Sequence, residues 1–128
     1  MGLDLEQVAI LLQRRYGVLR EIYKLTQEMQ NAVSRQDEVS LALLLDLRAE
    51  EMAKYDTVEQ ELWKQAEKGH TEWMELKRLL RTDPEQAEKA SNPMENKIFE
   101  IRRKSRTLLG QTQQLDQIVN RRVTGKAR

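Results

Sequence analysis

The chain has 128 residues, of which 39% are hydrophobic and 34% charged, with a formal net charge of +1 and no cysteine. This length corresponds to one domain, and a high charge content with few aromatic residues is typical of long, exposed helices. The lack of cysteine excludes disulfides and thiol chemistry, and the near-neutral net charge gives no general attraction to nucleic acid.

Helix-breaking residues are scarce in the first two thirds of the chain. The first proline is Pro84, and only three glycines precede it. Apolar residues recur there at spacings of three and four, which predicts amphipathic helices. The first helix is expected over 3–33. Its apolar stripe is wide enough for contact with two neighbouring helices and contains Leu5, Val8, Leu12, Leu19, Ile22, Met29 and Val33.

The second helix is expected over 38–81, after a short turn at 34–37. Asp37 is a suitable N-cap, and a connection this short makes the second helix antiparallel to the first. Gly69 could end or bend this helix. We expect one continuous helix, because the apolar stripe stays in phase from Leu62 and Ala66 through Trp73, Leu76 and Leu80.

A linker is expected over 82–92, with a short helical turn from Pro84 to Ala90. Asn92, Pro93 and Glu95 then form the N-cap, first-position proline and third-position acid of a capping box, which predicts a third helix over 93–123. The predicted fold is therefore all-α: a single domain over 1–128, built as an elongated three-helix bundle with a long antiparallel helical hairpin and a third C-terminal helix.

The sequence offers little for catalysis. Its only histidine is His70, no second histidine forms the paired motif of di-iron bundles, and no glycine-rich phosphate loop is present. We expect no enzyme and no catalytic, cofactor-binding or metal-binding residue. The N-terminal segment does not read as a signal peptide, and no run of residues is apolar enough for a membrane span.

The third helix is the candidate interaction surface. Its apolar residues are either core or a strip that awaits an amphipathic partner helix, which would read them as anchors at helical spacing: Leu108, Leu109, Leu115, Ile118 and Val119. Residues 93–128 also carry nine Lys or Arg against three acids, which is either a solvated face or a nucleic-acid contact. Trp63 and Trp73 are either core residues or interface anchors.

One segment resembles a known family. A long helix that holds Leu25, Glu28 and Met29 is followed by an aspartate-containing turn and then by spaced leucines, a basic residue and a further apolar pair. The residues of that second part are Asp37, Leu41, Leu44, Leu45, Arg48, Glu51 and Met52. This pattern is similar to that of the bacterial FlgN/FliT-like flagellar type III export chaperones, which share the length and the helical layout.

The resemblance implies a cytoplasmic chaperone. Such a protein would bind the C-terminal amphipathic helix of a late flagellar export substrate, a hook–filament junction or cap protein, and prevent premature assembly. It would also meet export-gate or ATPase components. The binding residues carried over are Leu108, Leu109, Leu115, Ile118 and Val119. The client, the oligomeric state and whether the third helix swaps between subunits stay open. The alternatives are a structural or adaptor coiled-coil homodimer and a regulator that binds nucleic acid through the basic third helix.

Overall fold

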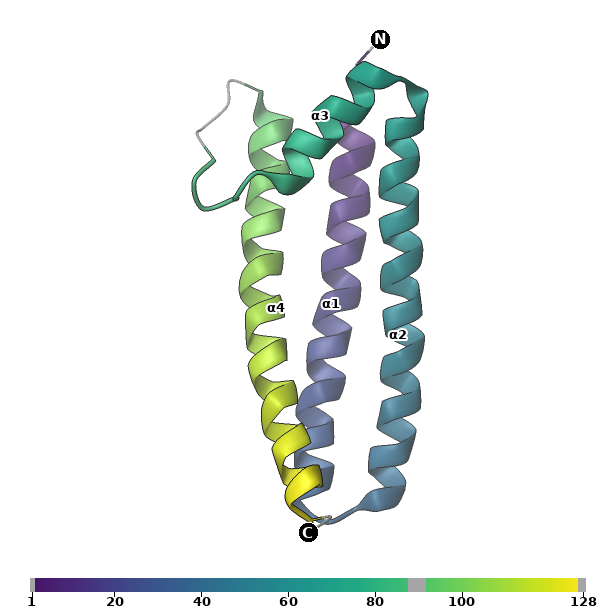
Figure 1. Ribbon diagram of the computed structural model, residues 1–128, viewed down its shortest axis with the longest axis vertical. Coiled ribbons are helices and arrows are strands. Elements are labelled where there is room, and N and C mark those ends of the chain that lie inside the picture. The colour runs from purple at the N-terminus through teal and green to yellow at the C-terminus, as the bar shows by residue number, and fades with distance from the viewer. Residues whose placement is uncertain (1, 88–91, 127–128) are drawn as a thin grey trace.

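The computed structural model describes residues 2–87 and 92–126 (Figure 1). This part of the chain is helical and contains no strand, which confirms the all-α prediction. It forms four α-helices and one short 3-10 helix, in the order α1 (Leu5–Ser34), α2 (Glu38–Lys64), η1 (Gln65–Lys68), α3 (His70–Arg81) and α4 (Pro93–Lys126).

The three long helices lie along the long axis of the molecule. α1 lies between α2 and α4 and packs against both, while the shorter α3 crosses one end of this array (Figure 1). α2 and α4 have hardly any backbone proximity to each other.

Each long helix begins at a polar side chain that caps its first turn. Asp4 Oδ1 accepts from the backbone N–H of Gln7 at 3.0 Å, and Asp37 Oδ1 accepts from that of Ser40 at 3.0 Å. Asn92 Oδ1 accepts from Met94 at 2.9 Å. These bonds satisfy N–H groups that have no partner within the helix. Asp37 and Asn92 are the caps that the sequence indicates.

The turn between α1 and α2 is closed by backbone hydrogen bonds. The N–H of Asp37 donates to Ala32 O at 2.9 Å, and that of Gln36 donates to Val33 O at 3.1 Å. This pair of bonds is a Schellman motif, which requires a left-handed residue just after the helix. Gln36 fills that position with φ at 58°. The chain reverses here, so α2 runs back antiparallel to α1 (Figure 1).

The prediction of one helix over 38–81 is wrong. α2 ends at Lys64, a 3-10 turn follows, and extended backbone at Gly69 separates it from α3. A continuous helix would extend about 20 Å beyond the end of α1, given a rise of about 1.5 Å per residue, and would leave its last apolar residues without a neighbour. The break returns α3 over α1 and buries Leu76, as expected, together with Leu79, whereas Trp73 of the expected stripe is exposed and Leu80 is half-buried.

The segment after α3 is partly described. Asp83 begins a turn in which its backbone oxygen accepts from Gln86 N–H at 3.1 Å and its side chain accepts from Glu85 N–H at 3.0 Å. The expected helical turn to Ala90 extends into residues 88–91, which lie outside the described part. Glu95, expected in a capping box, accepts from Arg78 of α3 at 2.6 Å.

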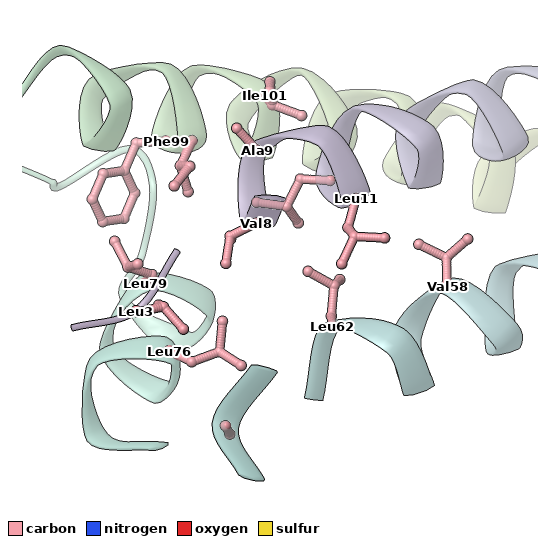
Figure 2. Close-up of a cluster of buried hydrophobic side chains, with 13 residues drawn as sticks. Leu3, Val8, Ala9, Leu11, Val58, Leu62, Leu76, Leu79, Phe99 and Ile101 are labelled. Atoms are coloured by element: carbon pink, nitrogen blue, oxygen red, sulfur yellow. The ribbon is translucent and has the colours of Figure 1, made fainter. Parts of the chain in front are cut away.

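The main core lies where α3 crosses the other helices. Figure 2 shows side chains from α1, α2, α3 and α4 converging there. Those that solvent does not reach at all include Val8, Leu12, Leu62, Leu76, Leu79 and Ile98. Burying a side chain of this kind contributes roughly 1.5–3 kcal/mol. The crossing end therefore contains the larger cluster of buried apolar side chains.

Toward the α1–α2 turn the core is much smaller. Met29 and Val33 of α1 pack there against Val119 of α4, with Leu41 and Leu44 of α2 at the margin. The seam between α1 and α4 also contains polar residues whose hydroxyls donate to the carbonyl four residues earlier in their own helix: Thr26, Ser105 and Thr112, each at 2.8 Å. These bonds allow small polar side chains to be buried.

Candidate binding groove

A groove runs along α1 between α2 and α4, starting where α3 ends. Its central part is a hollow of about 480 Å³, which we call the apolar hollow. Leu19 and Ile22 of α1 form its floor, Met52 and Tyr55 of α2 form one wall, and Leu109 of α4 belongs to the other. Met52 and Leu109 remain 45% and 40% exposed, respectively. Apolar side chains therefore face solvent across a concave surface, which is the usual form of a binding site.

An ion pair bridges the groove at the far edge of the apolar hollow. Arg48 Nη1 of α2 lies 2.6 Å from Asp116 Oδ1 of α4, and Arg48 also contacts Thr26 Oγ1 of α1 at 3.5 Å. The Arg48 side chain is largely buried and that of Asp116 is about one third exposed. This bridge links two helices that otherwise have few contacts with each other.

A second, smaller hollow lies beyond the bridge, close to the α1–α2 turn. Its volume is about 270 Å³, and we call it the turn hollow. Val33 of α1, Leu41 of α2 and Val123 of α4 supply apolar surface, and the acidic residues Asp37 and Glu38 stand beside them. Hydrogen bonds from Ser40 lower the pKa of Asp37, and the Arg35 guanidinium lies 3.9 Å from the same carboxylate.

The opposite end of the groove, below α3, is lined by four arginines. This arginine hollow has a volume of about 390 Å³. The guanidinium groups come from three helices, and one acid and several apolar residues share the lining: Arg15, Arg81, Arg102, Arg106, Asp83, Pro84, Leu19, Tyr55, Ser105 and Leu109. Leu19, Tyr55 and Leu109 line the apolar hollow as well, so the two hollows are continuous.

The residues expected on the partner-binding surface do not form a single strip. Leu109 lines both the apolar and the arginine hollows. Leu108 and Leu115 are half-buried, and Ile118 is exposed, but these three do not line the hollows described above. Val119 is only 2% exposed and packs against Met29 and Val33. It is therefore a core residue in this structure.

The sequence pattern did not single out Leu19, Ile22 and Tyr55 as site residues. They belong to apolar stripes that read equally well as core, because periodicity shows which side of a helix is apolar but not whether another helix covers it. Arg48 and Met52 could have been noticed from the sequence, since both belong to the motif that resembles the export chaperones. The structure puts both on the groove wall.

The two tryptophans have different environments. Trp63 is half-buried and packs against the main core, with the Arg81 guanidinium 5.6 Å from its ring centre. Trp73 is 40% exposed, and it stacks with His70 and lies under the Lys77 amine at 4.9 Å. Neither ring lines a hollow described above.

The described residues hold no group of three His, Cys, Asp or Glu side chains that could bind a metal. Among the same residues, none of the helices is both long and apolar enough to pass through a membrane. The feature that the fold builds is an elongated groove between two helices, with an apolar centre and charged ends. The structure thus defines an all-α protein with a candidate groove for another polypeptide. No family model, curated protein or solved structure was found to match the chain.

Proposed function

We propose that this protein is a cytoplasmic chaperone that receives an amphipathic helix in the groove between α2 and α4. Its clients are late flagellar export substrates, hook–filament junction or cap proteins, whose C-terminal segment it covers until delivery to export-gate or ATPase components. In this proposal the three long helices act as an elongated bundle with one open side. The protein shields its client by contact and needs no catalysis.

The observation that carries the proposal is that α3 covers the array of long helices at one end only. α3 is an amphipathic helix that crosses the array and buries Leu76 and Leu79 against side chains of α1 and α4. Beyond the end of α3 the same face of α1 continues into the apolar hollow, where no segment of the described chain covers it. A foreign helix with apolar residues at spacings of three and four would extend the packing that α3 begins.

The residues that carry the family resemblance support the same site. Asp37 and Leu41 line the turn hollow, and Arg48 and Met52 line the apolar hollow. Four members of one sequence motif therefore line two of the hollows. Met52, which is 45% exposed, supports a role in binding that a packed hairpin alone would not require.

The test uses peptides with the C-terminal sequences of the hook–filament junction and cap proteins from the same organism. We expect binding to the wild-type protein, and loss of at least tenfold in affinity for Met52→Asp and Leu109→Asp, because each places a charge in the apolar hollow. Leu43→Asp is the matched control. Leu43 is also an exposed apolar residue, 60% accessible, but it lies outside the apolar hollow. Failure of every peptide to bind would contradict the proposal.

A second candidate function, a structural or adaptor homodimer, is favoured by a separate observation. Val39, Leu43 and Leu47 recur every four residues on α2, and they are 84%, 60% and 38% exposed. An exposed stripe of this kind is typical of a helix that pairs with another copy. Sedimentation equilibrium separates the two functions: a dimer that Leu43→Asp dissociates, together with no peptide binding, supports the adaptor.

Nucleic-acid binding through the basic part of α4 has less support. Arg102 donates to Leu79 O and Thr82 O, Arg106 pairs with Asp83, and Lys104 pairs with Glu100. Arg106 and Lys104 are thus neutralised by acids within the chain, whereas Arg102 contacts only neutral backbone oxygens. A regulator of that kind would bind DNA or RNA with an affinity that falls steeply as salt rises.

A further inference from the structure

We infer that the arginine hollow binds the acidic end of the partner helix, so that the groove fixes the direction in which the helix lies. This inference rests on the proposed function, because it concerns the same groove. It adds a requirement on the chemistry of the partner: carboxylates at one end, about one helical turn from the apolar anchors.

The charge of the groove changes sign along its length. Four arginines against one aspartate line the hollow below α3. The apolar hollow has Arg48 against Asp56 and Asp116, and the turn hollow has Asp37 and Glu38, with Arg35 lying 3.9 Å from the Asp37 carboxylate. A docked segment with uniform charge would match only one end. A segment that is acidic toward α3 and has no strong charge beyond the apolar hollow matches this distribution.

The arginines retain an excess of positive charge after their contacts within the chain are counted. Arg15 pairs with Glu59, and Arg106 pairs with Asp83 at 2.5 Å. Arg102 has no acidic partner among its described contacts: it donates to the backbone oxygens of Leu79 and Thr82.

The Arg81 guanidinium carbon lies 5.6 Å from the centre of the Trp63 ring. This contact with an aromatic ring does not neutralise the charge of Arg81. Burial, followed by the positive charges of Arg15 and Arg106, lowers the pKa of Arg102. Bringing a carboxylate into the hollow would relieve this repulsion between like charges.

Continuity with the apolar hollow favours a polypeptide over a free anion. Leu19, Tyr55 and Leu109 line both hollows, so a ligand in one meets the wall of the other. On α4, Arg106 precedes Leu109 by three residues, or about 4.5 Å along the axis, and Asp116 by ten residues, or about 15 Å. A partner helix of three to four turns spans this distance. Its C-terminal end, where the helix dipole is negative, fits best beside the arginines.

The experiment compares two labelled 18-residue helical peptides with the same apolar face. One ends in two glutamates at its C-terminus, and the other has glutamines there. Affinities are measured at low salt for the wild-type protein, Arg81→Gln, Arg106→Gln and Arg20→Gln. Arg81 and Arg106 are exposed arginines of the hollow, whereas Arg20 is an exposed arginine of α1 outside its lining, so each variant removes one charge. Circular dichroism confirms that each variant is folded.

We expect the glutamate peptide to bind the wild-type protein about fivefold more tightly than the glutamine peptide, a difference of about 1 kcal/mol. Arg81→Gln and Arg106→Gln should each remove much of this difference, and Arg20→Gln should preserve it. A nitroxide at the glutamate end should broaden the amide signals of residues around Arg102 and not those around Val33.

Several results would overturn the inference, and they are distinguishable. Equal affinity of the two peptides in every variant, with binding still abolished by Met52→Asp, would refute the acidic contact and leave the groove as the site. Inorganic phosphate that saturates the hollow while the glutamates add no affinity would show a free-anion site instead. Binding of neither peptide, or binding that Met52→Asp does not change, would refute the proposed function together with the inference.

Discussion

The ion pair between Arg48 and Asp116 allows a quantitative test of how strongly α2 and α4 are coupled. It links α2 to α4 across a distance that little other packing bridges, with Nη1 and Oδ1 2.6 Å apart. Replacing Arg48 by Met keeps an unbranched apolar stem and removes the guanidinium and its charge, and replacing Asp116 by Asn keeps the shape of the carboxylate. The two single variants and the double variant form a thermodynamic cycle.

The expected magnitude follows from the surroundings of the pair. A charge-assisted hydrogen bond contributes about 1.5–3 kcal/mol when it is well shielded, and an exposed ion pair contributes about 0–1 kcal/mol. The Arg48 side chain is 14% exposed and that of Asp116 is 37% exposed, so the pair lies between these cases. We expect a coupling free energy of about 1–1.5 kcal/mol, and a decrease in Tm of about 3–5 °C for each single variant.

Urea unfolding followed by circular dichroism measures the three free energies of unfolding against the wild type. The exposed pair between Arg14 and Glu61 supplies a matched control. It also joins two helices, but at 3.3 Å and with side chains that are 54% and 42% exposed. Its cycle should give a coupling below about 0.5 kcal/mol. A coupling below about 0.3 kcal/mol for Arg48 and Asp116, or equal couplings for the two pairs, would refute this account of the bridge.

Three further outcomes are expected. Gln36→Gly should raise the free energy of unfolding by about 0.5–1 kcal/mol in urea melts, because glycine adopts the left-handed conformation of Gln36 without steric cost, and an unchanged or lower value would contradict this. Val119→Ala should lower the free energy of unfolding by about 1–3 kcal/mol, because it opens a cavity beside Met29. Ile118→Ala, at an exposed position, should lower it by less than about 0.5 kcal/mol. Equal decreases for the two variants would argue against a buried Val119. Burial raises the pKa of Tyr55. The contribution of the neutral Tyr55 side chain to stability should therefore be present at neutral pH and be lost as the pH rises through about 10 toward the raised pKa. Unfolding of the wild type and of Tyr55→Phe between pH 8 and 11 measures this difference, and parallel stability curves for the two proteins would contradict it.

Local sequence signals placed most helix ends correctly. The caps at Asp37 and Asn92 depend on one side chain and the N–H groups that follow it, so they are legible without a tertiary structure. The break after Lys64 was missed because it depends on tertiary packing and not on a local signal. The stripe around Gly69 stays in phase, and only the limited length of α1 makes it favourable for the chain to turn back and bury Leu79.

The candidate site was predicted only in part. Leu109 was expected at a partner surface and lines the groove, whereas Val119 was expected there and is buried. The two residues differ by ten positions, and both belong to the apolar side of one helix. What distinguishes them is their neighbour: Val119 meets Met29 and Val33 of α1, and Leu109 reaches past α1 toward the open space beside α2.

By itself the sequence determined that this protein is built from long amphipathic helices, where those helices begin and which sides of them are apolar. Caps, breakers and a period of 3.6 residues act over a few neighbouring positions, so they are written along the chain. Only the tertiary structure decided which apolar side chains are covered. Burial depends on how three helices and a crossing fourth share one another's surfaces, and it leaves a groove with arginines at one end and acids at the other, supplied by residues up to about 90 positions apart.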